Sequence, residues 1–330
     1  MIKIELSREV KIELEKKHSE WYSKKILKKI REEYEKIRCE ANYTLFLKKI
    51  LEKGKDFSIL ENEGMKEFID EYNSIVESTL GEKIKFEKIL KKIFNYGNFS
   101  RKNNEIWSRH KMMTTIDISV CPYCQRQYIT KYESKLELEE KKLTTGSLDH
   151  FYSQSEYPFL ALSLYNFIPS CSICNSIMKT SKETYNNEAK QENIIYPYKD
   201  DFKGKFTTGT KLLENLLSTK EVKVKIETED LKSENTVEMF KLNEVYETTH
   251  NKYLINMLDN IKNKPTAYLE SIAELFSTGK ESEKAKESEK EKIKDKLREL
   301  VLEPYKFKSN NGEPLGKLTK DILEEFGIEI

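Results

Sequence analysis

Glycine, proline and long apolar runs are all scarce in this chain of 330 residues, which contains 11 Gly and 7 Pro. A shortage of residues that break helices favours long helices. No run of about 18 apolar residues occurs, so no membrane-spanning helix is predicted. The first residues, from Met1 to Leu6, lack the apolar stretch and the small-residue cleavage site of a secretion signal, and we therefore expect a cytoplasmic protein.

The chain also lacks an excess of either charge. Its 58 Lys and Arg residues face 57 Asp and Glu residues, which gives a formal net charge of +1. A strongly basic composition would have indicated nucleic-acid binding; this one gives no such indication, yet it does not exclude a local basic groove or a basic partner. Hydrophobic residues make up 37% of the chain, and 15 Phe and 18 Tyr supply bulky core material, which argues against disorder throughout.

Length and periodicity predict an α+β protein that is mostly helical. About two domains of roughly 150 residues fit in the chain. Residues 1–110 carry apolar residues three to five positions apart, which predicts amphipathic helices that either pack in a core or bind a partner. Residues 111–205 contain the cysteine pairs. Residues 206–330 combine a short strand with helices and a charged segment at 280–299, which Pro304 is expected to end.

Four of the five cysteines form two C-x-x-C pairs, Cys121-Pro-Tyr-Cys124 and Cys171-Ser-Ile-Cys174. Each such turn places two thiolates on one side of a tight loop, and two turns make a tetrahedral site that suits Zn²⁺. A redox dithiol and an iron–sulfur cluster are alternatives, although a redox pair needs no second pair. Four thiolates close the coordination sphere, so this zinc is expected to be structural. Cys39 stands alone and is expected to be an ordinary buried thiol.

The segment between the cysteine pairs carries Asp149 and His150 in a short expected strand that begins after Gly146. Neighbouring strand residues point to opposite faces, so a loop or bulge is needed for both to reach one phosphate. A histidine with an ordinary pKa near 6.5 can be neutral at pH 7, as a general base requires. Asn175 is expected in the first turn of the next helix, leaning towards the pair. Oxygen ligands of this kind suit Mg²⁺ better than thiolates do.

These residues together resemble the HNH endonuclease family, also called the ββα-metal nucleases. The resemblance rests on the Asp149-His150 pair, on the central Asn166, and on Asn175 followed by Lys179, all in a frame of two C-x-x-C pairs. It implies a small zinc-pinned ββα core within the helical protein. It also implies hydrolysis of phosphodiester bonds, with DNA as the expected substrate.

The subgroup with flanking cysteine pairs includes components of bacterial anti-phage systems, among them PtuB of the Septu system and the HNH proteins associated with retrons. The stretch 195–201, with its proline and acidic residues, and the Leu242-Asn243 element are also similar to that subgroup. The resemblance covers about residues 115 to 260. It implies a role in anti-phage defence with an AAA- or ABC-type ATPase as partner.

The resemblance implies a role for each site residue. His150 would activate water, Asp149 and Asn175 would bind one Mg²⁺ or Mn²⁺ ion, and Asn166 would hold the loop that carries His150. Many HNH proteins have histidine where this chain has Asn175, a difference that affects metal preference more than activity. Asn166 has the alternative of a simple turn residue. Lys179 is either a phosphate contact or a solvated helix residue.

Two other functions are compatible with the sequence. One is a non-catalytic zinc-binding adaptor that uses the HNH frame to bind nucleic acid or a protein. The other is a nuclease that is nearly inert until its ATPase partner joins it.

Basic and aromatic residues also interleave just before the first cysteine pair. Trp107, Arg109 and His110 indicate either a domain junction anchored by Trp107 or an approach to the active site that contacts phosphate. His18, His110 and His250 belong to no motif and are expected to be structural or exposed.

Overall fold

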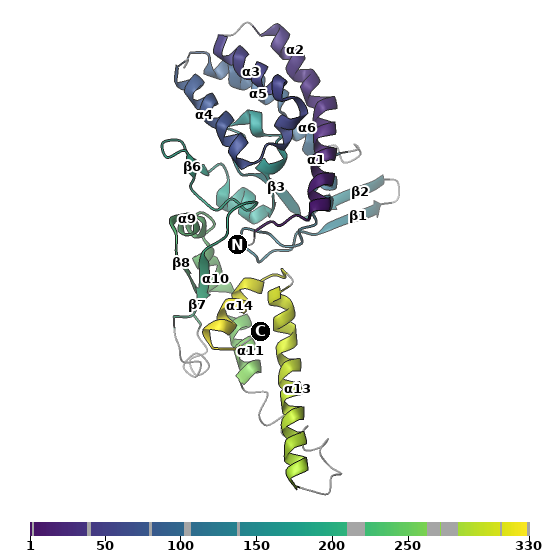
Figure 1. The fold of residues 1–330 in the computed structure, drawn as a ribbon, viewed down its shortest axis with the longest axis vertical. Helices are drawn as coiled ribbons and strands as arrows, with labels where there is room; N and C mark the ends of the chain where they lie inside the picture. The colour runs from purple at the N-terminus through teal and green to yellow at the C-terminus, as the bar shows by residue number, and fades with distance from the viewer. Residues whose placement is uncertain are drawn as a thin grey trace. The chain divides into compact units, whose positions relative to one another are not determined.

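The computed structural model describes residues 1, 3–37, 41–78, 81–101, 107–136, 139–209, 222–262, 271, 283–310 and 312–328. These residues form two compact units, Met1–Phe202 and Lys203–Ile330, each of which is described here by itself (Figure 1). The fold is mostly helical with small antiparallel sheets, as the α+β prediction requires. The three-region division of the sequence stays a prediction, and Cys39 lies outside the described residues.

Helices make up the first part of the N-terminal unit. α1 and α2 run along one side of a bundle that also contains α3, α4 and α5 (Figure 1). The left-handed conformation of Gly54, with φ +60°, ends α3. The bounds of these elements, with η for short 3₁₀ or π-helical segments, are α1 (Arg8–Tyr22), η1 (Ser23–Leu27), α2 (Lys28–Lys36), α3 (Ala41–Lys53), η2 (Gly54–Ile59), α4 (Asn62–Ser78), α5 (Lys83–Ile93), α6 (Tyr96–Arg101) and α7 (Arg109–Ile116).

The segment with the predicted site residues has the order strand, strand, helix. β3 (Gly146–His150) pairs antiparallel with β4 (Phe167–Cys171), and η5 (Ile173–Lys179) follows directly. The register is unbroken from Gly146 opposite Cys171 to His150 opposite Phe167, so β3 has no bulge at Asp149 and His150, and the strand ends at His150. The other elements here are β1 (Lys131–Leu136), β2 (Glu139–Thr144), η3 (Pro158–Leu160), η4 (Leu164–Asn166), β5 (Tyr185–Asn186) and β6 (Gln191–Glu192).

The helical bundle packs on the loop that joins β3 to β4. Phe159 in this loop has its ring centroid 5.1 Å from those of both Phe46 in α3 and Tyr72 in α4. α7 packs on the start of β3, where a Cβ atom added at Gly146 would lie 2.6 Å from Met113. It would also lie 2.4 Å from Ile129, so a larger residue at position 146 would force both side chains to shift on the strand that carries Asp149 and His150.

The C-terminal unit is a small sheet covered by helices. β7 and β8 pair antiparallel, from Gly204 opposite Thr228 to Thr207 opposite Lys225. α14 packs against β7 and α13, and α11 also contacts α13. The bounds are β7 (Gly204–Thr207), β8 (Lys225–Thr228), α9 (Leu231–Met239), α10 (Leu242–Thr249), α11 (Asn251–Lys262), α13 (Glu283–Asn310) and α14 (Gly316–Glu325).

Pro304 lies inside α13 and does not end it, so that prediction is wrong. An interior proline costs about 3 kcal/mol, because it removes a hydrogen bond and clashes with the preceding turn. Contacts beyond the proline hold the helix in place: the Tyr305 hydroxyl accepts a hydrogen bond from Asn260, and the Lys308 ammonium lies 4.5 Å from the ring centre of Tyr253. Of the helices that the structure describes, none is both long and apolar enough to cross a membrane.

Candidate functional site

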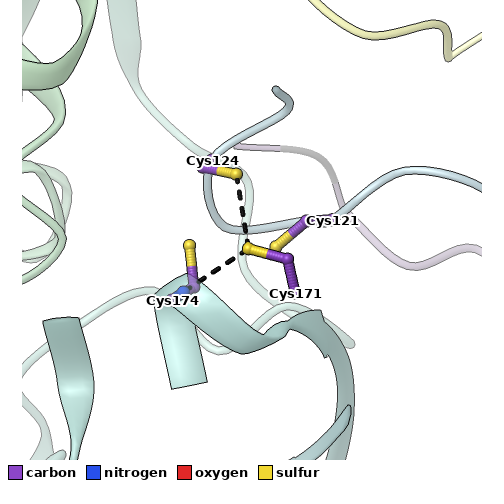
Figure 2. A group of neighbouring side chains, drawn as sticks. All are labelled: Cys121, Cys124, Cys171 and Cys174. Carbon is purple, nitrogen blue, oxygen red and sulfur yellow. Dashed lines mark hydrogen bonds between the residues drawn. The ribbon is translucent and has the colours of Figure 1, made fainter. Parts of the chain in front are cut away.

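The two cysteine pairs meet in one buried cluster. Their four Sγ atoms all lie within 4.8 Å of one another. Cys174 lies at the start of η5, Cys171 ends β4, and Cys121 and Cys124 come from the loop after α7 (Figure 2). The thiols of Cys124 and Cys171 are 3.9 Å apart, and the backbone N–H of Cys174 points at Cys171 Sγ from 3.4 Å.

This cluster fits a metal ion such as zinc. Burial raises the pKa of the Cys121 thiol, while hydrogen bonds from the neighbouring thiols lower that of Cys124. A cation at the centre would hold all four sulfurs as thiolates, and four sulfurs leave no place for substrate. The role of a metal at this site would therefore be structural: it would fix the loop after α7 to the end of β4.

The carboxylate of Asp149 is held from both sides by residues next to these cysteines. Tyr123, between Cys121 and Cys124, donates its hydroxyl to Asp149 Oδ2 at 2.7 Å. Lys179, at the end of η5, lies 2.9 Å from Asp149 Oδ1. Tyr123, Asp149 and Lys179 are all at most 2% exposed. The cysteine cluster thus fixes both of the donors that hold this carboxylate.

The position of Lys179 differs from both expectations for it. It is neither solvated nor free to meet a phosphate, because its ammonium binds Asp149 and the backbone carbonyl of His150. η5 ends at Lys179, and this last residue of the helix faces inward rather than towards solvent. A buried ammonium needs such partners, since an unpaired buried charge is very costly.

The oxygen ligands expected for Mg²⁺ or Mn²⁺ do not form a ready site. Both oxygens of Asp149 already accept hydrogen bonds, and the Lys179 ammonium lies where a cation would bind. Asn175 is half-buried, and its side chain makes no hydrogen bond to Asp149 or His150 among the described residues. Within the described chain, the cysteine cluster is the only group of three or more Cys, His or acidic residues close enough to share an ion.

His150 lies at the end of β3 in a largely aromatic setting. Its ring centroid is 4.7 Å from that of Tyr96 and 5.2 Å from that of Phe167. Its Nε2 is 3.0 Å from the carbonyl oxygen of Ala161. A carbonyl only accepts, so Nε2 carries the proton and Nδ1 keeps a lone pair. Burial lowers the pKa of His150 to about 4, so the ring is neutral at pH 7 with its Nδ1 lone pair free of a proton.

Asn166 ties together the loop after His150. Its Oδ1 accepts the Tyr152 N–H at 2.7 Å, and its Nδ2 donates to the carbonyls of Tyr152 and Leu160. Its backbone carbonyl also accepts the N–H of Phe151 at 2.9 Å. Asn166 is fully buried, so each of these bonds is shielded from water. The side chain of Asn166 therefore closes this loop.

The segment 195–201 is hydrogen-bonded to the start of β4 and to the residues just before it. Tyr196 donates its hydroxyl to the carbonyl of Tyr165 at 2.7 Å, and Tyr198 donates to that of Phe167 at 3.0 Å. These two carbonyls flank Asn166. The same tyrosines line a pocket of about 540 Å³ together with Tyr165, and none of the predicted site residues lines this pocket. The stretch 195–201 therefore supports the strand opposite His150.

Three residues of this region were not assigned to the site from the sequence. Tyr123 and Tyr96 contact Asp149 and His150, and Arg109 lies beside Tyr96. The sequence feature that could have indicated Tyr123 is its position between two predicted metal ligands, Cys121 and Cys124. Arg109 was marked by the mixture of basic and aromatic residues around it, but nothing in the sequence gave its neighbours.

His18 and Trp107 form a separate buried network. Trp107 Nε1 donates to His18 Nδ1 at 3.0 Å, and His18 Nε2 lies 2.9 Å from the carbonyl of Leu162. Because indole nitrogen only donates, His18 must be neutral with its proton on Nε2. Trp107 thus acts as the packing anchor. Of the other two histidines outside the motif, His110 is buried and His250 is half-buried.

This network predicts a stability that falls in acid. Burial lowers the pKa of His18 to about 4, against 6.5 for the free side chain. The unfolded chain therefore binds the extra proton between pH 6.5 and 4, and stability drops as the pH falls through that window by about 3 kcal/mol. Urea unfolding at pH 7 and pH 4 measures this loss. The loss should be smaller by that amount in His18→Gln, and an equal loss in both proteins would contradict the assignment.

Comparisons with known proteins assign this chain to no family. A scan against protein-family models, a search of curated proteins and a search of solved structures each found no match.

Proposed function

We propose that this protein is an endonuclease of the HNH type that hydrolyses phosphodiester bonds in nucleic acid, with DNA as the expected substrate. The observation that carries the proposal is His150 at the end of β3, in an antiparallel pair followed by η5. Its hydrogen bond to Ala161 leaves Nδ1 as the basic atom. The loop tied by Asn166 and the buried cysteine cluster support the same conclusion.

In this proposal His150 acts as the general base. A water molecule attacks phosphorus and gives a proton to Nδ1 of His150, while the bond from phosphorus to the leaving oxygen breaks. The Ala161 carbonyl keeps the ring in the required tautomer throughout. Asp149, being bound to Tyr123 and Lys179, positions the end of β3 and the helix η5 rather than accepting the proton.

The proposal gives a structural role to zinc and no catalytic step to Mg²⁺ or Mn²⁺. Zinc at Cys121, Cys124, Cys171 and Cys174 would be structural. A divalent Mg²⁺ or Mn²⁺ ion at Asp149 and Asn175 fits only if the Lys179 ammonium leaves Asp149, and we assign no catalytic step to that ion. The nicking assay described below measures whether cleavage depends on Mg²⁺ or Mn²⁺.

The biological setting follows from the resemblance alone. The proposal places the nuclease in the bacterial cytoplasm as part of an anti-phage system, together with an AAA- or ABC-type ATPase. A nuclease of this kind would be weakly active alone and gain activity when the ATPase joins it. Co-purification with such an ATPase and ATP-dependent cleavage would distinguish this arrangement from a free-standing enzyme.

The test is plasmid nicking by zinc-loaded protein. The protein is dialysed free of other divalent ions and assayed with and without added Mg²⁺ or Mn²⁺. His150→Ala should lower the nicking rate by about 10²- to 10⁴-fold, because it removes the general base. His250→Ala, a matched change in the C-terminal unit, should retain full activity. Equal nicking by His150→Ala and the unchanged protein would refute the proposal.

A non-catalytic adaptor is the second candidate, and one observation favours it. Asp149 is 2% exposed and His150 is 8% exposed, so the closed site offers substrate little access. An adaptor would bind nucleic acid or a protein without cleaving it. Tight DNA binding with no nicking under any of the conditions above, unchanged by His150→Ala, is the result that would favour this function.

A further inference from the structure

An arginine outside the predicted motif, Arg109, lies beside Tyr96, the ring that contacts His150. Arg109 begins α7, four residues before Met113, so the two side chains share one face of that helix. Met113 packs on Gly146 at the start of β3. The four residues from Arg109 to Met113 span about 6 Å along the axis of α7, and the long arginine side chain reaches further. Arg109 therefore lies away from Gly146, where it interacts with Tyr96, and Tyr96 contacts His150.

Tyr96 connects Arg109 to His150. Its ring meets that of His150 edge to face at 4.7 Å. Burial raises the pKa of Tyr96, and the nearby Arg109 guanidinium offsets part of that rise. Asp149 also acts on the Tyr96 hydroxyl through its charge. The Tyr96 hydroxyl therefore lies within the electrostatic reach of both Arg109 and Asp149.

Arg109 adds a positive charge beside Tyr96, the ring that contacts His150. Asp149 and Lys179 neutralise each other as a buried pair. Arg109 forms no ion pair with any residue that the structure describes, and its buried Nε has no hydrogen-bond partner. The hydroxyl of Ser108, the preceding residue, is also buried and unpaired. A guanidinium donor and a hydroxyl are thus left without a hydrogen-bond partner next to Tyr96, which contacts His150.

We propose that Arg109 binds a phosphate group of the nucleic-acid backbone next to His150. This inference rests on the proposed function and adds a substrate-binding residue to it. A guanidinium offers several N–H donors in a rigid plane that matches two phosphate oxygens, whereas a lysine ammonium is a point charge. Lys179 cannot take this role while it is bound to Asp149. Arg109, one ring away from the base through Tyr96, is the cation of the described chain to which we give this role.

Two assays with three variants test this role. Arg109→Gln removes the charge, Arg109→Lys keeps it without the planar donors, and Arg31→Gln is a matched control on the exposed face of α2. Binding to a fluorescent DNA duplex is measured by anisotropy at several salt concentrations, with His150→Ala in every protein so that no cleavage occurs. Plasmid nicking is measured with His150 intact, and thermal unfolding of each protein is recorded.

Arg109→Gln should weaken DNA binding about tenfold and reduce the salt slope by about one, as expected for one lost phosphate contact. Arg109→Lys should restore the slope but keep a lowered kcat. Arg31→Gln should match the parent in both assays. If Arg109→Gln unfolds, Arg109→Lys alone tests the role. A parent-like salt slope together with a lowered kcat would then support phosphate binding by Arg109.

A parent-like affinity, salt slope and kcat in Arg109→Gln or Arg109→Lys would overturn this inference while leaving the nuclease proposal intact. Failure of the parent to nick DNA would refute the nuclease proposal instead. The anisotropy assay would still report whether Arg109 binds DNA.

Discussion

The Cys171→Ser protein is expected to bind no zinc and to lose the ordered structure of β3, β4 and η5. Structural zinc contributes roughly 10–16 kcal/mol of apparent binding free energy in zinc-finger peptides at pH 7. Whole domains are stable by only about 5–15 kcal/mol. Because all four sulfurs lie within 4.8 Å in a buried cluster, loss of one ligand leaves the other three without the cation that would link them.

Metal analysis and hydrogen exchange measure this result. The unchanged protein should carry one zinc ion per chain, and peptides covering β3 and β4 should exchange slowly. In Cys171→Ser these peptides should exchange at least about tenfold faster, while those of α4 should change much less. Cys39→Ser is the matched control, since it removes the one cysteine that belongs to neither C-x-x-C pair. A full zinc content and unchanged exchange in Cys171→Ser would contradict the metal assignment.

Lys179→Met should destabilise the N-terminal unit by about 3–5 kcal/mol. The substitution keeps a side chain of similar length but leaves the Asp149 carboxylate buried with only Tyr123 as a partner. Breaking a buried ion pair by removing one partner typically has a cost of this size, because an uncompensated charge remains. Urea unfolding of zinc-loaded protein at pH 7 measures the change.

Two further variants separate the charge effect from packing. The double variant Asp149→Asn with Lys179→Met removes both charges and should recover most of the lost stability. Lys48→Met breaks an exposed pair with Glu52 and should cost at most about 0.5 kcal/mol. If Lys179→Met were as mild as Lys48→Met, the buried pair would not hold the site together.

These two expected results concern one physical arrangement. The cysteine cluster fixes Tyr123 in the first pair, and η5, which starts within the second pair, carries Lys179. Both donors converge on Asp149 from those segments. Loss of zinc should therefore release the carboxylate as well as the sulfurs, and loss of Lys179 should disturb the end of η5 beside Cys174.

The sequence was sufficient for features that depend on local spacing. Two C-x-x-C pairs predict a four-sulfur cluster because each turn fixes its own two thiols, and the cluster is present. The strand after Gly146 follows from a short apolar pattern, and its alternation puts Asp149 and His150 on opposite faces. The same local reasoning failed at Pro304, where contacts from Asn260 and Tyr253 continue a helix that propensity alone would end.

The partners of the candidate site were decided by the tertiary structure. Tyr123, Lys179 and Arg109 lie 26 or more positions from Asp149 or His150 in the chain. Their meeting depends on how α7, β3 and η5 pack, and no periodicity encodes that. The sequence by itself determined which residues can bind a metal or accept a proton. Only the packing decided that Lys179 neutralises Asp149 and that Arg109 lies beside Tyr96 with its Nε unpartnered, because such pairing depends on distances in space.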